Sequence, residues 1–442
     1  MKTIVRSFTS LALMTLSLTA FGQNQTATVD SLKKSLNSLT SDVEALKNLK
    51  IGGWIQAQYQ WTETKGAKTF EGGDFLANSN NRSVIRRGRI KFTYTKGIGQ
   101  YVLQVNATER GVNVVDFYAK VTDPWTKAFS LTAGIMNRPF GFEIQQSSQE
   151  RETPERARFT QVLLPNERDL GAMITFQPAK GKKLYGLKVD AGFYNGTGIA
   201  VPGTTSLNGA GVVDFDSYKD FIGRAHYKKS LKQDKVTLGA GVSHYNGGVV
   251  YQNNKVYSTL ATDSLGVMSW AVSDTTNGTT FKGGKAPRIY YGGDLQFSIK
   301  SKLGTTSIRG EYITGTQTGT VDENKSPSSL PTKPDAVVRN FNGGYAYLIQ
   351  RIGKTKHEIA VKYDWYDPNT KVTGDNLVGT NGMTKAELKY TSLGVGYNYY
   401  MTENVKFMVY YNMVTNENAK ALTGYTTDLK DDVLTFRMQF RF

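Results

Sequence analysis

The chain has 442 residues, of which 39% are hydrophobic and 12% aromatic, with no cysteine and a formal net charge of +17. The lack of cysteine excludes disulfide bonds and cysteine-ligated zinc, and suits a protein that passes through an oxidising compartment. The positive charge alone would fit a nucleic-acid-binding protein. The N-terminal sequence argues against that partner, because it directs the chain out of the cytoplasm.

Residues 1–22 have the features of a cleaved export signal. Lys2 and Arg6 precede a largely apolar run over residues 8–21, and the segment ends on small residues that a signal peptidase requires. We expect cleavage after Gly22. A membrane anchor is the less favoured alternative, because the apolar run is too short to span a bilayer. No later run is long enough for a transmembrane helix, which leaves a periplasmic protein, a surface protein or an outer-membrane barrel.

Residues 23–50 are expected to form a periplasmic coiled-coil segment. Apolar residues recur at alternating steps of three and four, which is the spacing of heptad a and d positions. A helix of so few heptads is only marginally stable in isolation. The pattern therefore favours self-association over a single helix packed on its own domain. The predicted contact residues are Val29, Leu32, Leu36, Leu39, Val43 and Leu46.

From residue 51 to 442 apolar and polar residues alternate with period two, which is typical of strands with two different faces. The long strand-rich region is rich in tyrosine and phenylalanine rather than in aliphatic residues. The alternation predicts sixteen strands near 51–61, 84–96, 99–108, 112–122, 127–137, 170–178, 184–194, 217–230, 234–246, 287–300, 303–315, 339–352, 355–366, 386–400, 404–414 and 431–442.

The connections between these segments alternate between long and short. Loops such as 62–83 and 138–169 follow one end of the strands, and tight turns such as Gly97–Ile98 join the other end. At the end of the barrel where the other connections are long, only the connection 109–111 is short. An even strand number with this alternation predicts an all-β fold, a transmembrane antiparallel β-barrel of 16 strands.

The last strand has the pattern of an assembly signal. Phe440 and the terminal Phe442 lie on its apolar face, whereas Arg437 and Arg441 lie on the other. An alternating apolar strand that ends on phenylalanine resembles the C-terminal assembly signal of outer-membrane barrels.

Strand 84–96 contains a dense group of cations. A Lys or Arg that faces lipid at mid-membrane costs a few kcal/mol, so charges are expected on the lumen face. Strict alternation sends Arg87, Arg89 and Lys91 to the lumen and Arg86 to the membrane interface, where its aliphatic stem could snorkel.

The same alternation assigns further charges to the lumen. The cations exceed the acids, which predicts a positive pore that attracts anions. The alternative is that acids on neighbouring strands merely neutralise the cations. The predicted lumen cations are Arg138, Arg224, His226, Lys228, Arg288, Arg309, Arg437 and Arg441, and the predicted lumen acids are Asp116, Asp190, Asp220, Asp294, Glu311, Glu358 and Asp364.

The connection 138–169 is the predicted constriction loop. It is long, polar and charged, and it contains Ser147, Ser148 and Arg151. Hydroxyl groups and the planar guanidinium fork are good ligands for phosphate or carboxylate. The alternative is an ordinary surface loop.

The order of several short motifs resembles the phosphate-selective porin O and P family over roughly residues 50–442. These motifs begin at residues 86, 97, 116, 134, 168, 193 and 363, and read RRGRI, GIGQY, DFYA, GIMNRPFG, RDLG, FYNGTG and YDWYDPN. The resemblance implies a homotrimer of sixteen-stranded barrels and an arginine-lined anion path. Carried over by position, it implies roles for Arg87 and Arg89 in the second-strand motif, for Asp116, and for Ser147, Ser148 and Arg151 in the constriction loop. Phosphate-selective members also carry a dense lysine cluster near the outer mouth, whereas here the loop lysines are scattered over Lys65, Lys68, Lys282, Lys285, Lys325 and Lys333.

The sequence therefore predicts an outer-membrane porin for passive diffusion of anions, phosphate included. A general small-solute porin and a plugged structural or adhesion barrel with a periplasmic partner remain alternatives. The expected partners are outer-membrane lipid and lipopolysaccharide, the barrel-assembly machinery, inorganic anions as solutes and further copies of the chain, with no nucleic acid. We expect no enzyme activity, catalytic residue, metal or cofactor, because His226, His244 and His357 show no metal-ligand spacing and no nucleophile motif.

Overall fold

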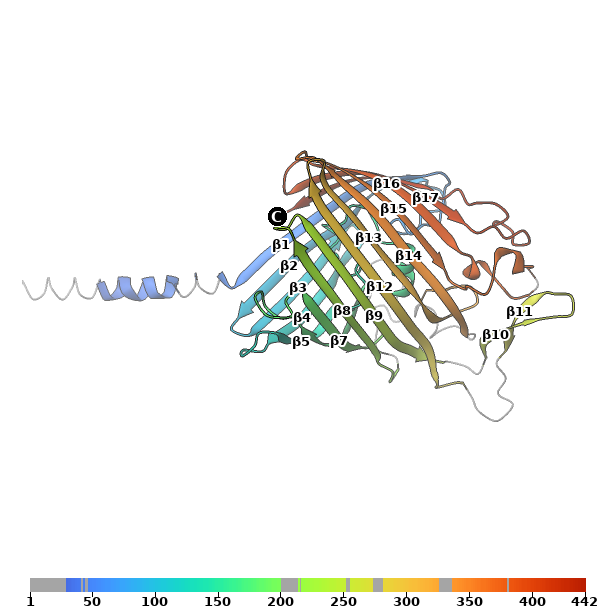
Figure 1. Ribbon diagram of the computed structural model, residues 1–442, viewed down its shortest axis with the longest axis horizontal. Coiled ribbons are helices and arrows are strands. Elements are labelled where there is room, and N and C mark those ends of the chain that lie inside the picture. The colour runs from blue at the N-terminus through green and yellow to red at the C-terminus, as the bar shows by residue number, and fades with distance from the viewer. Residues whose placement is uncertain are drawn as a thin grey trace, which may run out of the picture.

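A computed structural model describes residues 29–40, 43, 47–199, 214, 216–251, 255–272, 281–325, 336–379 and 381–442. Its main body is one closed antiparallel barrel, drawn in Figure 1. The predicted signal peptide (1–22) and Leu46 lie outside these residues. Among the residues described, no helix combines the length and apolarity needed to cross a bilayer.

Sixteen strands form the barrel wall, as the alternation predicted. Each predicted segment matches one observed strand, and the ends differ by at most four residues. The strands run in chain order around the wall, and β18 pairs with β1 to close it. The wall strands are β1 Leu49–Thr62, β2 Asn81–Lys96, β3 Gly99–Thr108, β4 Gly111–Thr122, β5 Phe129–Asn137, β6 Arg168–Phe176, β7 Leu187–Tyr194, β8 Asp220–Leu231, β9 Val236–Val250, β12 Lys285–Ser301, β13 Gly304–Gly319, β14 Ala336–Ile352, β15 His357–Asp367, β16 Tyr390–Tyr400, β17 Val405–Asn416 and β18 Val433–Arg441.

Two further strands lie in the connection between β9 and β12, which the sequence had been expected to leave as a loop. β10 (Val256–Thr262) and β11 (Met268–Val272) pair with each other as an antiparallel hairpin. Figure 1 shows this hairpin at the end of the barrel opposite the N-terminal helix. It is an elaboration of an outer loop, so the wall itself keeps sixteen strands.

Side chains alternate between a polar inner face and an apolar outer face. On β1, Gln56, Gln58 and Gln60 are buried inside, whereas Ile55 and Tyr59 are exposed outside. Amide and hydroxyl groups on the inner face bond across strands, as between the side chains of Gln60 and Thr435 at 3.0 Å. This division is what a barrel with a lipid-facing exterior and a polar interior requires.

The C-terminus completes the wall. Phe442 exchanges two backbone hydrogen bonds with Gly53, at 3.0 and 3.1 Å, and Phe440 lies exposed on the outer face. Deletion of Phe442 should lower the amount of folded barrel, because it removes both bonds and the terminal aromatic residue. Heat-modifiable migration of membrane extracts on gels measures this, with Leu303→Ala in an exposed turn as the control. Equal amounts of folded barrel would contradict the predicted assembly signal.

Candidate functional site

The long connection between β5 and β6, residues 138–167, lies inside the barrel. Its backbone and side chains bond to inward-facing residues of strands on opposite parts of the wall. Gln56 of β1 donates to the Ser148 carbonyl at 3.0 Å, and Lys406 of β17 donates to the Arg151 carbonyl at 2.8 Å. On the other side, the hydroxyl of Ser243 in β9 accepts the Gly141 N–H at 2.9 Å. The loop therefore crosses the lumen.

An apolar base holds this loop against one side of the wall. The short helix α2 (Arg158–Leu163) buries Phe159, whose ring stacks on Tyr345 of β14 at a centroid distance of 6.1 Å. Phe140 packs edge-on against Tyr290 of β12 at 6.4 Å. Gly292 and Gly343 leave room for these two rings, since a Cβ at either position would meet the phenylalanine at 2.9 Å. Aromatic packing therefore fixes this side of the loop against the wall.

Glu155, near the middle of the loop, binds three arginines from the wall. Its carboxylate lies 2.7 Å from Arg86, 2.9 Å from Arg87 and 3.1 Å from Arg437, and only 2% of its side chain is exposed. Sequence reasoning missed Glu155, because the loop has no periodicity that would indicate its orientation. Its position between Arg151 and the pair Arg156 and Arg158 was the signal available in the sequence.

The outward orientation expected for Arg86 is wrong. In the pairing of β1 with β2, Gln56 is opposite Arg87 and Ala57 is opposite Ile85, so Arg86 is the extra residue of a β-bulge. A bulge places two consecutive residues on one face of the strand. Both Arg86 and Arg87 consequently reach Glu155 inside the barrel. The arginine pair within an otherwise alternating strand is the sequence signal that strict alternation overlooked.

Acids on the wall and the loop neutralise several of the predicted lumen cations. Arg309 binds Glu152, and Arg224 binds Asp294 at 2.9 Å. Arg288, fully buried, binds Asp220. Asp116 binds Arg168 at the start of β6, at 3.0 Å. These cations, together with Arg87 and Arg437 on Glu155, are therefore neutralised by nearby acids, which is the alternative to an attractive positive pore.

A second group of predicted cations has no carboxylate within ion-pair distance among the described residues. Arg89 lies over the Trp54 ring at 5.6 Å, and Lys91 follows it on the inner face of β2. Arg138 donates one N–H to the Pro165 carbonyl at 2.7 Å, while its other two guanidinium nitrogens have no described partner. These residues add positive charge to the lumen that no described carboxylate neutralises at ion-pair distance.

Arg151 is the most unusual member of this group. Only 1% of it is exposed, and none of its three guanidinium nitrogens has a hydrogen-bond partner among the described residues. Its charge repels those of Arg87, Arg89 and Arg156 around it. The hydroxyl of Ser148 is likewise buried without a described partner, and Ser147 is half-buried beside it. The loop thus places donors that lack a described partner among several arginines.

The first outer loop, 63–80, also enters the mouth of the barrel. The guanidinium of Arg158 lies 4.5 Å from the ring centroid of Phe70 and 3.7 Å from that of Tyr390 in β16. Near Phe70, the Glu71 carboxyl is buried, and burial raises its pKa from 4.5 to about 7, against the attraction of Lys362. One of its oxygens has no described hydrogen-bond partner.

The packing of loop 63–80 should therefore weaken as the pH rises. A buried carboxyl with a raised pKa binds its proton more tightly in the packed state, so packing is strongest below about 4.5 and weakens up to about 7. Trypsin cleavage at Lys65 and Lys68 reports the release of this loop. Wild-type protein should be cut at the Glu71→Gln rate at pH 5 and faster than Glu71→Gln at pH 8. Because wild type and Glu71→Gln are compared at the same pH, the pH dependence of trypsin itself cancels. Equal cleavage rates of the two proteins at pH 8 would contradict the prediction.

Comparison with known proteins places this barrel among porins. A family model described as phosphate-selective porin O and P matches residues 66–274 and 337–442. A search of curated proteins gave no match. Among solved structures, OprB of Pseudomonas putida is similar with a TM-score of 0.54 and 10% identity, covering 91% of this chain and 96% of that one. The outer membrane channel DcaP of Acinetobacter baumannii has a TM-score of 0.49 and 11% identity over 89% of this chain and 97% of its own. At these identities the similarity shows the fold alone.

Proposed function

Because the chain belongs to the phosphate-selective porin O and P family, we propose that it is an outer-membrane porin through which anions, phosphate among them, cross by passive diffusion. The single observation that carries the preference for anions is the buried guanidinium of Arg151, which has no hydrogen-bond partner in the part of the chain that the structure describes. We propose that the mature chain starts at Gln23, after removal of the signal peptide, and that three copies assemble.

A buried guanidinium without a counter-ion attracts anions because its own burial is costly. A buried cation without a partner is strongly unfavourable, and an anion that shares its position recovers much of that cost. Arg151 presents a planar fork of N–H donors, which matches the oxygens of phosphate or carboxylate. Arg89 and Lys91 extend the positive charge along the inner face of β2, with a side-chain spacing of about 6.6 Å between alternate residues.

The test is the reversal potential of the purified protein in a planar bilayer under a KCl gradient. An anion-selective potential supports the proposal, and a cation-selective one overturns the argument from Arg151. Phosphate should then reduce the chloride current at lower concentration than a monovalent anion of similar size. If phosphate and the monovalent anion reduce the chloride current at the same concentration, the protein is an anion porin without phosphate selectivity.

One observation favours a second candidate, a plugged barrel with a structural or adhesive role. Loop 138–167 bonds to strands from β9 around to β2, as the contacts of Ser243, Lys406 and Arg87 show. A lumen crossed so extensively would conduct little. Absence of any conductance from protein that migrates as a folded barrel would favour this candidate over the porin.

A further inference from the structure

The outer wall around strands β8 to β14 contains an apolar groove of about 1140 Å³. One row of paired residues across this groove is built mainly from small side chains, and it runs from β9 to β14 through Ala240, Leu295, Gly310 and Ala346. Large side chains border the row, and they are Tyr227, Leu238, Phe297, Ile308, Tyr312 and Trp365. Because the outer face of the barrel meets lipid tails, a hollow there loses packing contacts unless a flexible chain fills it.

Lys229 brings a positive charge to one end of this groove. It is exposed, and it follows Tyr227 on the outward face of β8. The inward-facing charges of these strands are held inside the barrel, as in the pair of Arg224 and Asp294 at 2.9 Å. Among the described outward residues that line the groove, Lys229 is therefore the one charged side chain.

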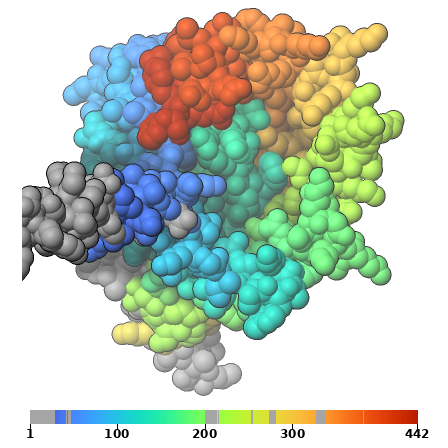
Figure 2. All heavy atoms as spheres, turned by 90° about the vertical axis from the view of Figure 1, so that its left-hand side faces the viewer, coloured from blue at the N-terminus to red at the C-terminus, as the bar shows by residue number. Residues whose placement is uncertain are grey.

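Further lysines continue this positive charge from Lys229 onto the rim of the barrel. The β8–β9 and β12–β13 turns lie next to each other, because the Lys300 N–H donates to the Lys235 carbonyl at 2.8 Å. Asp234 is the one acid in these two described turns. Figure 2 looks onto this end of the barrel, where the N-terminal helix also lies. The exposed lysines of the two turns and their flanks are Lys232, Lys235, Lys300 and Lys302.

The charged end of the groove also fixes the membrane leaflet that it meets. Short turns of such barrels lie on the periplasmic side, so Lys229 lies at the level of the inner leaflet, whose headgroups are those of phospholipids. A lysine stem can lie along an apolar surface while its ammonium group reaches the headgroups. Lysines close to a bilayer surface attract acidic lipids.

From these observations we infer that the groove binds a phospholipid with an acidic headgroup. An acyl chain lies on the row of small residues, and the phosphate lies near Lys229 and the turn lysines. The inference rests on the outer-membrane location given in the proposed function, and it does not depend on which solute crosses the pore.

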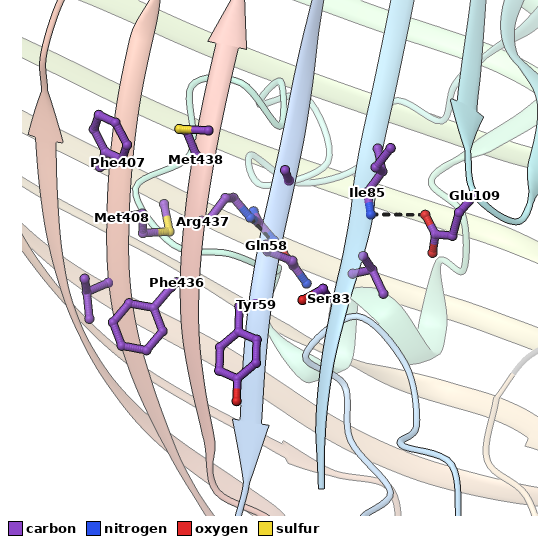
Figure 3. A pocket seen from close by; sticks show the side chains of 13 residues that line it. Gln58, Tyr59, Ser83, Ile85, Glu109, Phe407, Met408, Phe436, Arg437 and Met438 are labelled. Carbon is purple, nitrogen blue, oxygen red and sulfur yellow. Dashed lines mark hydrogen bonds between the residues drawn. The ribbon is translucent and has the colours of Figure 1, made fainter. Parts of the chain in front are cut away.

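A second outer hollow, on β17, β18, β1 and β2, has the opposite charge and provides the comparison (Figure 3). Its volume is about 580 Å³, and its lining includes Phe407, Phe436 and Ala57. The exposed charge beside it is the carboxylate of Glu109, which accepts the Ile85 N–H at 3.0 Å. A carboxylate repels an acidic headgroup, so this hollow should show no preference for acidic lipid.

Retention of lipid in native mass spectrometry tests the role of the charge. Protein in mild detergent is mixed with equal amounts of phosphatidylglycerol, which is acidic, and phosphatidylethanolamine, which is zwitterionic. Wild type should retain phosphatidylglycerol preferentially, and Lys229→Gln should lower this retention about fivefold. The matched control Lys127→Gln removes an exposed lysine from the β4–β5 turn, away from the groove, and should keep wild-type retention. No preference in wild type, or an equal loss in both variants, would overturn the inference.

Filling the groove tests the position of the acyl chain. Ala240→Trp obstructs the row of small residues, and Ala346→Leu obstructs it less severely, whereas Ala57→Trp fills the hollow of Figure 3. Both groove variants should lower phosphatidylglycerol retention several-fold with the lysines intact, and Ala57→Trp should not. Heat-modifiable migration shows which variants are folded.

Two results would place something other than a lipid chain in the groove. Unchanged retention in a folded groove variant would mean that the headgroup binds the turns alone. Loss of oligomers without loss of lipid would mean that a second copy covers the groove, and either result overturns the inference. Conductance is measured separately in bilayers of zwitterionic lipid, so failure of the lipid site is distinguishable from failure of the proposed porin function.

Discussion

Neutralising Arg151 should remove much of the channel's preference for anions. In Arg151→Gln, the difference between the reversal potential under a KCl gradient and the value for a non-selective channel should fall several-fold. The reason is that this guanidinium is buried and lacks a described counter-ion, so no described carboxylate at ion-pair distance offsets its effect on passing ions.

The magnitude follows from Coulomb's law. At an effective dielectric constant of about 20 and a distance of about 8 Å, one unit charge changes the energy of an ion by about 2 kcal/mol. Mobile salt reduces this, since the screening length is about 10 Å at 0.1 M. Arg89→Gln should act in the same direction, because Arg89 also has no described carboxylate partner. Arg87→Ala should have a smaller effect, because Glu155 already offsets the charge of Arg87.

The matched control is the double variant Arg224→Gln with Asp294→Asn. It removes a buried ion pair of 2.9 Å from the same lumen without a change in net charge. We expect it to keep the wild-type reversal potential. An unchanged potential in Arg151→Gln, or an equal shift in the control, would exclude Arg151 from the anion pathway.

The strands and their facing could be predicted from the sequence because alternation is a local signal. Lipid on one side and polar groups on the other leave the same mark on each strand, from β1 to β18. This local signal failed at Arg86, where the bulge between Ile85 and Arg87 reverses the facing of one residue. Alternation within one strand does not show how many residues lie opposite each other on the paired strand, which is what defines a bulge.

The pairing of charges within the lumen could not be predicted for a different reason. The partners of Glu155 lie on β2 and β18, separated by most of the chain, and only closure of the barrel brings them together. Composition indicated an excess of cations but did not show which of them were free. The distinction between Arg309, held by Glu152, and Arg151, without a described partner, depends on the three-dimensional path of loop 138–167.

The substitution Glu155→Gln should partly release that loop from the wall. It would leave Arg86, Arg87 and Arg437 close together without the carboxylate that now lies within 3.1 Å of each. Loss of one partner from a buried ion-pair cluster costs about 3–5 kcal/mol. The arginines are fixed on strands, so the loop is the element that can move.

The release should be incomplete, because other bonds still hold the loop. Gln439 donates to the Gln149 carbonyl at 3.0 Å, and Lys406 donates to the Arg151 carbonyl at 2.8 Å. We therefore expect Glu155→Gln channels to show larger and noisier single-channel conductance than wild type. Glu403→Gln, which alters an exposed carboxylate in the turn between β16 and β17, is the control for a change in charge alone.

Glu155→Asp separates the charge from the position of the carboxylate. It keeps the negative charge but shortens the side chain by one methylene, so it should retain quieter channels than Glu155→Gln. Heat-modifiable migration shows whether each variant forms a folded barrel, independently of its conductance. Folded Glu155→Gln with the conductance and noise of wild type would mean that the aromatic base around Phe140 and Phe159, rather than this ion cluster, holds the loop across the lumen.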